Sequence, residues 1–584
     1  MPSLVGQKET FTLRIRSEDQ WGNPSGKQPV ELFPTANAPL DGLPASLLLA
    51  DGHATAVIEG LRPTATGDLL IELRDRDGRR VAVSNAMSIV KEIPQNRLYW
   101  ADFHAQSGET IGTNAAEDYF AFARDTAFID IVGHQGNDFQ ITAEFWKQLN
   151  ELYDRFDEPG RFVTIPGYEW SGNTALGGDR NVFFAFSGQT IRRSSHALVP
   201  DHSDLATDCH TANELFAAIR QGGEDVITFA HVGGRYADIG VAHDVAIETA
   251  VEVHSSWGTF EWIVNDAFDL GYRVGIVANS DGHKGRPGAE GPGASMFGAY
   301  GGLTCLQLPE LSRGAIFEAL RARRHYATTG ARVLLDVTVS FTGGAQQFAA
   351  DPVLGPTTHQ PVTRAQMGAI VHTEAETAVI SIAASALASS PIERVEVRNG
   401  RETVAVHRPY GAAQLGRRIR VIWSGAEYRG RFRMTPWDGR AVIDGNAFER
   451  ADPVNFFNPD RPLHREGEQA LSWRSITTGN FSGFDATLRE ADAGRLRIET
   501  AQGKLDIAVS DIGYQPLSFA FGGLDRKLVV YRLPDINDCL SVAFDQAVAL
   551  QADRDNPLYV SVFTEDGHQA WSSPVYAIPR PDWL

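Results

Sequence analysis

A series of short apolar runs between Tyr99 and His283 constrains the fold of this chain more than any other feature of its 584 residues. Each run has the length and composition of a buried strand. A residue able to bind a metal follows each of them: His104, His134, Glu169, His231, His254 and the pair Asp281 and His283. A barrel of parallel strands gathers the carboxyl ends of its strands at one mouth. The pattern therefore predicts that these side chains meet at one site.

Segments that favour helices lie between these runs. We expect helices to begin near Thr113 or Asn114, Thr142, Thr211, Thr259 and Ser312. A further run at 303–308 brings the expected strands to seven. Strands that alternate with helices in this way are typical of βα units and a parallel sheet. We therefore expect residues 96–330 to form a parallel sheet closed into a barrel.

The sequence on either side of this region has the pattern of β-sheets. Residues 1–95 alternate apolar and polar positions between turn signals, which predicts a small antiparallel β-sandwich of immunoglobulin-like size. Residues 331–584 show the same alternation, and their length suits one large sandwich or two smaller ones. The predicted fold class is thus a multidomain α/β plus β protein, with a central barrel between N-terminal and C-terminal antiparallel β-domains.

Tryptophan residues recur in the C-terminal β-region, at Trp423, Trp437, Trp473, Trp571 and Trp583. They suit the core of a sandwich, which is the commoner place for aromatic residues, or a sugar-binding face. The sequence leaves both interpretations open.

The charge balance limits the kinds of partner. The formal net charge is −20 and the pI is near 5.3, so a nucleic-acid backbone or an anionic membrane would be repelled. The three cysteines form neither a disulfide framework nor a zinc ribbon. The first residues lack the pattern of a signal peptide, which makes the cytoplasm the expected compartment, or the periplasm if a leader is removed. We expect a small-molecule substrate, and a homo-oligomer remains open.

The candidate ligands form a mixed set of imidazole nitrogens and carboxylate oxygens without thiolates. Such a set suits Mn²⁺, Zn²⁺ or Fe²⁺. A carboxylate with imidazoles on both sides is what a pair of metals requires, and such a pair activates water and neutralises charge on an attacked phosphoryl or acyl group. The chain contains no GxSxG, GxGxxG or Walker motif, so competing chemistries have little support.

Several polar residues near these positions are candidates for substrate binding. The Gly-rich loop 283–293 places Lys284 and Arg286 beside the expected metals, either as anion-binding residues or as mobile surface charges. Arg180 and Arg235 are weaker candidates, for which a solvated or salt-bridged side chain is the better explanation. The long connection from Glu169 to Thr211 is expected to form a lid or pocket wall. The last candidates lie just after His134 and are Gln135 and Asn137.

Three motifs resemble those of the PHP (polymerase and histidinol phosphatase) superfamily. They are Tyr99–Ser107 (YWADFHAQS), Ala127–His134 (AFIDIVGH) and Asn279–His283 (NSDGH). The segments 167–170, 178–182, 280–288 and 570–576 are also similar to a large bacterial group of PHP-like proteins of unassigned function. The resemblance implies a distorted (β/α)7 barrel that holds two or three Mn, Zn or Fe ions and hydrolyses phosphate esters, and for this chain we expect one to three such ions.

The resemblance also implies roles for individual residues. His104, Gln106, Glu169 and Asp281 would hold one metal, and Glu169 would bridge to a second. The second metal would be held by His231 and His254, and a third by His134 and His283. Gln106 stands where the superfamily has a second histidine, and Gly133 where it has an aspartate. An amide oxygen binds a metal more weakly than imidazole does, so one or two firmly bound metals are expected.

The sequence therefore predicts a metal-dependent hydrolase, above all a phosphoesterase in which a metal-bound hydroxide attacks the phosphorus of a small organic phosphate. Catalytic roles would fall to Asp281, and to His134 or His283 as the group that protonates the leaving oxygen. Two alternatives remain. The same site would cleave an amide, a lactone or a sulfate ester, or the altered motifs mark a degenerate metal site in a non-catalytic binding or scaffold protein.

Overall fold

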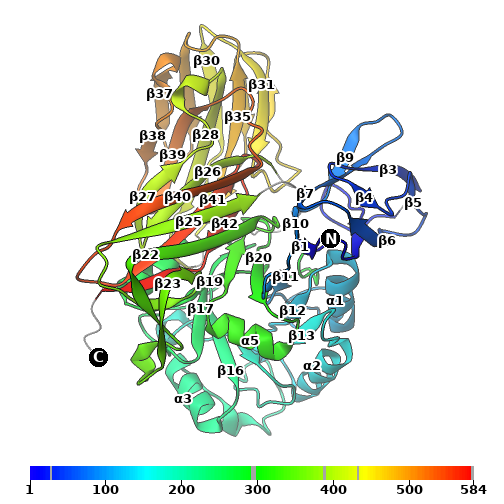
Figure 1. The fold of residues 1–584 in the computed structure, drawn as a ribbon, viewed down its shortest axis with the longest axis vertical. Helices are drawn as coiled ribbons and strands as arrows, with labels where there is room; N and C mark the ends of the chain where they lie inside the picture. Colours follow the sequence, from blue (N-terminus) through cyan, green and yellow to red (C-terminus); the bar gives the residue numbers. More distant parts are fainter. Residues whose placement is uncertain (27–28, 291–297, 386–389, 431–432, 580–584) are drawn as a thin grey trace.

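The computed structural model describes residues 1–26, 29–290, 298–385, 390–430 and 433–579. Most of its regular structure is β-strand, and the five α-helices of the described chain all lie in the central part (Figure 1). None of these helices has both the length and the apolar composition needed to cross a membrane. The architecture is therefore multidomain and mostly β.

Ten N-terminal strands form three small sheets around one apolar core. The sheet orders are β1-β10-β7, β2-β6-β4 and β5-β3-β8-β9, and all described pairs are antiparallel except β1 with β10. The strands are β1 (Leu4–Gly6), β2 (Phe11–Arg16), β3 (Val30–Ala36), β4 (Leu40–Asp41), β5 (Leu47–Leu49), β6 (Thr55–Pro63), β7 (Gly67–Leu69), β8 (Ile71–Arg74), β9 (Arg80–Val83) and β10 (Met87–Val90).

The central part alternates strands and helices, as predicted. Its strands are β11 (Arg97–Asp102), β12 (Ile131–Gly133), β13 (Val163–Ile165), β14 (Gly167–Trp170), β15 (Arg180–Phe184), β16 (Val226–Ala230), β17 (Glu248–Ser255), β18 (Gly258–Thr259), β19 (Gly275–Ala278), β20 (Leu303–Leu308) and β21 (His325–Thr328). Its helices are α1 (Ala116–Phe122), α2 (Ala143–Phe156), α3 (Ala212–Gly222), α4 (Glu261–Asp269) and α5 (Arg313–Arg321).

Local capping explains where the helices begin. The Thr142 side chain accepts a hydrogen bond at the start of α2, and Thr211 forms a capping box with Glu214 at the start of α3. Helix α1 begins later than predicted, because Asn114 adopts a left-handed conformation with φ 65°. The Glu109 carboxylate accepts the hydrogen bond from the Ala116 N–H at 3.0 Å instead. A carboxylate from outside the helix therefore caps α1.

The seven expected strands are present, but they do not form one closed parallel barrel. Strands β13, β12 and β11 are parallel, whereas β20 runs antiparallel to β11. A second sheet has the order β14-β15-β16-β17-β18, with β19 on β17, and β15 is antiparallel to both neighbours. Among the described strands no ladder joins β19 to β20. Pro166 is the single residue between β13 and β14, and the chain passes there from the first sheet to the second.

The sheet that contains β11 continues into the C-terminal region. Strand β21 pairs with β42 (Gln569–Ser572), and the order runs on through β41, β43, β24, β22 and β25 to β40. The remaining strands of this part are β22 (Leu334–Phe348), β23 (His359–Gln366), β24 (Ile370–His372), β25 (Thr377–Ser385), β26 (Ile392–Asn399), β27 (Glu402–His407), β40 (Ser541–Ala549), β41 (Asn556–Thr564) and β43 (Val575–Ile578). Backbone hydrogen bonds thus tie the end of the chain to the central part.

A separate sandwich is inserted between β27 and β40, and it forms the upper lobe in Figure 1. Its two five-stranded sheets have the orders β31-β35-β28-β39-β38 and β32-β33-β30-β36-β37. The strands are β28 (Arg418–Ala426), β29 (Thr435–Pro436), β30 (Gly439–Asp444), β31 (Phe448–Val454), β32 (His464–Glu466), β33 (Ala470–Trp473), β34 (Ile476–Thr477), β35 (Phe481–Leu488), β36 (Arg495–Thr500), β37 (Lys504–Ala508), β38 (Leu517–Ala520) and β39 (Leu524–Leu533). We call residues 418–533 the inserted sandwich.

The tryptophans of the C-terminal region lie in cores. Trp423, Trp437 and Trp473 are buried inside the inserted sandwich, and Trp571 is buried against the central part. Trp583 lies outside the described residues. The four described rings therefore do not form an exposed sugar-binding face.

A buried histidine next to the central sheet predicts how stability depends on pH. His325 on β21 donates from Nδ1 to the Ile276 carbonyl at 3.1 Å, and burial lowers its pKa from 6.5 to about 3. At a pH between these two values His325 binds a proton in the unfolded chain but not in the folded chain. The free energy of unfolding therefore falls as the pH drops below 6.5. Between pH 7 and pH 4.5, we expect the free energy of unfolding of His325→Gln to fall by about 3 kcal/mol less than that of the wild type. Urea unfolding at pH 7, 5.5 and 4.5 measures this, and equal pH slopes in both proteins would contradict it.

Candidate metal centre

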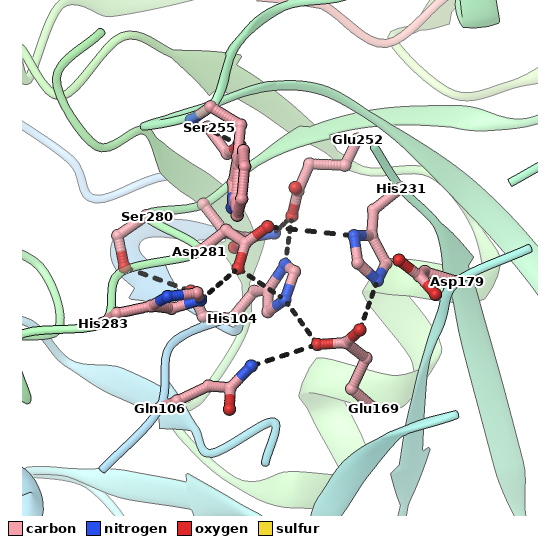
Figure 2. Close-up of polar contacts among 12 residues, drawn as sticks. His104, Gln106, Glu169, Asp179, His231, Glu252, Ser255, Ser280, Asp281 and His283 are labelled. Atoms are coloured by element: carbon pink, nitrogen blue, oxygen red, sulfur yellow. Dashed lines mark hydrogen bonds and ion pairs between the residues drawn. The ribbon is translucent and has the colours of Figure 1, made fainter. Parts of the chain in front are cut away.

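The ends of several central strands bring ionisable side chains together in a buried cluster (Figure 2). His104 follows β11 and His231 follows β16, Glu169 and Glu252 lie on β14 and β17, and Asp281 follows β19. Each of these residues is at most 3% exposed. Elements from both central sheets therefore contribute to one site.

Backbone contacts fix Asp281 beside His104. The Asp281 N–H donates to the His104 carbonyl at 2.6 Å, and the Gln106 N–H donates to the Gly282 carbonyl at 2.9 Å. Asp281 adopts a left-handed conformation with φ 44°, which aspartate tolerates better than most residues. The turn after β19 thus directs the Asp281 carboxylate toward the end of β11.

Distances within the cluster suit metal ligands. His104 Nε2 lies 3.3 Å from Asp281 Oδ1 and 3.7 Å from Glu169 Oε2. His231 Nε2 lies 3.8 Å from Glu169 Oε1, and His231 Nδ1 lies 4.0 Å from Asp281 Oδ2. Glu169 and Asp281 each face both imidazoles. Two carboxylates shared by two histidines form the mixed set of donors that divalent transition metals bind.

Several potential ligand atoms of this cluster make no hydrogen bond within the described chain. They are buried and make no hydrogen bond: His104 Nε2, both ring nitrogens of His231, and Asp281 Oδ2. Unpaired buried polar atoms are costly, and native proteins leave few of them. One metal ion could bind His104 Nε2, Asp281 Oδ2 and one ring nitrogen of His231, because the two nitrogens of an imidazole point in different directions. The residues therefore fit a metal, and the chain contains a buried His/Asp/Glu cluster able to bind one.

Glu252 orients the His104 ring. Its Oε2 accepts from His104 Nδ1 at 3.2 Å and from the Asn279 amide at 2.7 Å. A carboxylate only accepts, so Nδ1 carries a proton, and Nε2, which faces Asp281 and Glu169, is the nitrogen left to bind a metal. Such a carboxylate–histidine pair fixes the tautomer of a metal ligand and makes it more basic.

A second group of donors adjoins the first and includes Asp179. Asp179, Glu169 and His231 present atoms that all lie within 4.8 Å of one another. Asp179 directly precedes β15, which is antiparallel to β16, so it lies next to the residue that follows β16. Burial and the nearby Glu169 raise its pKa to about 8. Asp179 also pairs with Arg235, whose Nε lies 2.8 Å from Oδ1.

Charges within the cluster favour the ionised carboxylates. Burial would raise the pKa of Glu169 and of Asp281, but His104, together with His231 at Glu169 and His283 at Asp281, lowers both. Burial would lower the pKa of His104, whereas Asp281 and Glu252 raise it well above its ordinary value. Burial and His104 lower the pKa of His231 well below its ordinary value. The cluster thus combines anionic oxygens with a neutral imidazole at His231, as metal binding requires.

Gln106 lies in the cluster as a hydrogen-bond donor. Its Nε2 donates to Glu169 Oε2 at 3.2 Å, and its Oε1 accepts from the Thr110 hydroxyl at 2.9 Å. The amide oxygen therefore faces Thr110, away from the carboxylates. In this arrangement Gln106 holds Glu169 in place.

His134 and His254 lie outside the cluster. His254 is neutral, because burial lowers its pKa to about 4, and its two nitrogens contact Thr259 Oγ1 at 2.8 Å and the Tyr300 carbonyl at 2.9 Å. The carbonyl accepts from Nε2, so Nδ1 accepts from Thr259 and has no lone pair left for a metal. The expected second-metal role of His254 therefore has no support from this geometry.

His134 forms a separate hydrogen-bonded chain. Its Nδ1 accepts from the Gly136 N–H at 3.3 Å, its Nε2 lies 2.8 Å from Ser107 Oγ, and Ser107 donates to Glu109 at 2.5 Å. Burial lowers the pKa of His134 to about 4. Both ring nitrogens thus have protein partners, and His134 helps to fix the loop that caps α1.

A cavity of about 440 Å³ adjoins the cluster. Its walls include Gln106, Asn137, Glu169, Asp179, Arg235, Asp281 and His283. His283 Nε2 lies 3.6 Å from Asp281 Oδ1, and its side chain is 19% exposed. Of residues 171–210, which were expected to form a lid, Asp179 is the one described residue in the wall.

The other candidate substrate-binding residues face elsewhere. Arg180 is buried and held by Glu248 at 2.9 Å, Lys284 Nζ lies 3.3 Å from Glu290, and Gln135 donates to the Val182 carbonyl at 3.4 Å. None of these three, nor Arg286, is among the described residues of the cavity wall. Residues 291–293 of the Gly-rich loop lie outside the described residues. Asn137 and Arg235 are the candidates that the structure brings to the cavity.

Sequence reasoning missed Glu252, Asp179 and Arg433. Glu252 is a lone acidic residue within an apolar run, which is itself a signal of a special environment. Asp179 was part of a motif but did not follow an expected strand. Arg433, which also lines the cavity, comes from the inserted sandwich, and no local pattern connects it with the central part.

Comparison with known proteins gives a partial match to one family and several distant relatives. Residues 77–235 match a family described as a protein of unknown function (DUF3604). That match includes His104, Glu169, Asp179 and His231 but ends before Asp281. An uncharacterized protein from Chlamydia pneumoniae is 23% identical over 372 residues, and one from Chlamydia trachomatis is 21% identical over 369 residues.

These matches are partial. Each alignment covers 58% of this chain and 56% of the relative, so the chain spans about half the length of the curated relatives it matches. A two-domain protein from Bacteroides vulgatus, described as containing a predicted PHP-like metal-dependent phosphoesterase, aligns over 71% of this chain and 97% of its own. Its TM-score of 0.28 and identity of 10% are too low to carry an argument about this chain.

Proposed function

We propose that this protein is a metal-dependent phosphoesterase that acts on small organic phosphates. The observation that carries the proposal is the set of buried donor atoms on His104, His231 and Asp281 that have no hydrogen-bond partner within the described chain. They adjoin a cavity whose wall includes the cationic Arg235. A metal site next to a cavity with a positive charge has the groups that hydrolysis of an anionic ester needs.

His104, His231, Glu169 and Asp281 would hold the metal, and Asp179 adds a donor for a second ion. The nitrogen and oxygen donors favour Mn²⁺, Zn²⁺ or Fe²⁺. When bound, a metal of this kind polarises a phosphoryl oxygen and lowers the pKa of a coordinated water. Glu252 holds the His104 ring in the orientation that this requires.

Other residues would bind the substrate and move protons. The Arg235 guanidinium attracts an anionic group, and Asp179 fixes its position. His283 lies at the cavity, close to Asp281, and would hold the proton that the leaving oxygen needs. His134 has protein partners at both ring nitrogens, so this proposal assigns the proton transfer to His283.

Hydrolysis of an amide or a lactone is a second candidate, and one observation favours it. Lys284 and Arg286 are not among the described residues of the cavity wall, so the anion-binding pair expected from the sequence does not face the cluster. Two other arginines, Arg235 and Arg433, do line the cavity. A phosphate is therefore the better match to the charges around the site.

Metal content and substrate choice together test the proposal. Elemental analysis follows purification and incubation with Mn²⁺, Zn²⁺ or Fe²⁺, and hydrolysis is measured with p-nitrophenyl phosphate, sulfate and acetate. We expect about one or two equivalents of metal per chain. We also expect phosphate hydrolysis that disappears after chelation and returns when metal is restored.

The outcomes separate the three hypotheses. Metal-dependent hydrolysis of the acetate in preference to the phosphate would favour the amide or lactone enzyme. Failure to take up any of the three metals would contradict both hydrolase hypotheses and favour a binding or scaffold protein.

A further inference from the structure

An arginine of the inserted sandwich reaches the cavity beside the metal cluster. Arg433 lies between β28 and β29, and it is 4% exposed. Its Nε donates to the Gly430 carbonyl at 3.0 Å, and its Nη2 donates to the Gly233 carbonyl in the central part. These two bonds fix the guanidinium at the boundary between the sandwich and the cluster.

The remaining nitrogen of this guanidinium is available to a ligand. Arg433 Nη1 is buried and has no hydrogen-bond partner among the described residues, and Arg433 lines the cavity. The guanidinium also lies over two rings, with centroid distances of 5.6 Å to Trp257 and 5.2 Å to Phe260. Burial lowers its pKa to about 10, so it stays charged at neutral pH. A buried cation with an unused donor is the usual partner of an oxyanion.

The cavity also has an apolar side. Ile111, Phe139, Trp257 and Met434 contribute to its wall. A volume of about 440 Å³ lies within the range of small-molecule sites. An occupant that uses both features carries an anionic group together with an aliphatic or aromatic body.

We propose that Arg433 is a substrate-binding residue that holds an oxygen of the anionic group, while the organic part of the substrate packs against Phe139 and Trp257. This inference rests on the proposed function and narrows its substrate class to small organic phosphate monoesters with an apolar body. Arg235 and Arg433 then bind the anion from the central part and from the inserted sandwich respectively. The site is complete only when the inserted sandwich is in place.

Close backbone contacts hold the inserted sandwich at this position. Gly258 and Gly479 have positive φ values of 144° and 99°, and a Cβ at either would collide with the carbonyl oxygen of Thr478 or Thr259. Thr478 itself lines the cavity. The Asn480 amide donates to the Gly298 carbonyl at 2.7 Å. Turns of the inserted sandwich and of the central part are therefore in close contact next to Arg433.

Binding of phenylphosphonate tests this inference, because its C–P bond resists ester hydrolysis. Titration calorimetry is run on metal-loaded and chelator-treated protein with phenylphosphonate and methylphosphonate. The variants are Arg433→Gln, Arg433→Lys and the control Arg429→Gln. Arg429 belongs to the same segment but pairs with Asp266 at 2.7 Å, and it is not among the described residues of the cavity wall.

We expect Arg433→Gln to weaken phenylphosphonate binding by about 10- to 100-fold, since it removes a buried charged donor. Arg433→Lys should weaken phenylphosphonate binding less than Arg433→Gln does, and Arg429→Gln should bind phenylphosphonate as tightly as the wild type does. Phenylphosphonate should bind about tenfold more tightly than methylphosphonate, because its ring buries apolar surface. Thermal unfolding of each variant separates loss of binding from loss of folding.

A crystal structure of the wild-type complex gives a second test that needs no variant. A phosphonate oxygen within about 3.2 Å of Arg433 Nη1 supports the inference. A phosphonate bound elsewhere, wild-type binding by a folded Arg433→Gln protein, or no binding by wild type in either form would overturn it. Absence of metal together with Arg433-dependent binding would contradict the proposed hydrolase, and it would make Arg433 an anion-binding residue but not a substrate-binding one.

Discussion

An Asp281→Asn protein is expected to bind metal at least about a hundredfold more weakly than wild type, and to lose its hydrolytic activity with it. Asp281 is the carboxylate nearest to His104 Nε2, at 3.3 Å, and its other oxygen faces His231 Nδ1 at 4.0 Å. Asparagine keeps the shape of the side chain but removes its charge. Changes outside the ligand sphere cost about 10- to 100-fold in metal affinity, so loss of a ligand should cost at least as much.

The position of Asp281 makes this test specific. Its backbone N–H is bonded to the His104 carbonyl, and this bond is retained in the variant. Metal affinity, measured by competition with a chelator, and metal-dependent activity should therefore fall without loss of folding. Glu290→Gln is the matched control, because Glu290 is a buried carboxylate nearby that pairs with Lys284. An Asp281→Asn protein with unchanged metal affinity would remove Asp281 from the proposed site.

Replacing Glu252 with glutamine is expected to weaken metal binding by about 10- to 100-fold. This loss is smaller than the one expected for Asp281→Asn. The Glu252 carboxylate accepts a hydrogen bond from His104 Nδ1. Glutamine would place either an amide N–H or a neutral oxygen there. The His104 ring would then lose the partner that fixes its tautomer and strengthens its lone pair. Activity should fall in proportion to metal occupancy and recover partly at high metal concentration.

Glu248→Gln provides the matched control for this variant. Glu248 lies on the same strand and is also buried, but its partner is Arg180, at 2.9 Å. Its loss should lower stability, because a buried arginine is left unpaired, while metal affinity stays at the wild-type value. If Glu252→Gln eliminated metal binding as completely as Asp281→Asn, Glu252 would be a ligand and not an orienting residue.

Much of the central part could be predicted from local patterns. Apolar runs with charged residues at their ends located all seven expected strands, and capping residues such as Thr142 and Thr211 located helices. These signals are local, since burial and capping depend on residues a few positions apart. They also directed attention to His104, Glu169, His231 and Asp281, which the structure brings together.

The direction and pairing of strands were decided by tertiary structure. An apolar run indicates that a strand is buried, but it does not say which neighbour the strand pairs with or in which direction. The antiparallel pair β14 and β15 and the reversed β20 therefore replace the expected closed parallel barrel. The pairing of β21 with β42 joins residues 326 and 572, a separation that no local pattern predicts.

The same distinction applies to the candidate site. By itself the sequence determined the donor types, which are nitrogen and oxygen without sulfur. Only the tertiary structure decided which side chains share the cluster: it placed His254 and His134 apart and added Glu252 and Asp179. It also brought Arg433 from the inserted sandwich to the cavity, because Gly258 and Gly479 let two distant turns approach closely. Ligand chemistry is a property of single residues, whereas the contacts of a site arise from long-range packing.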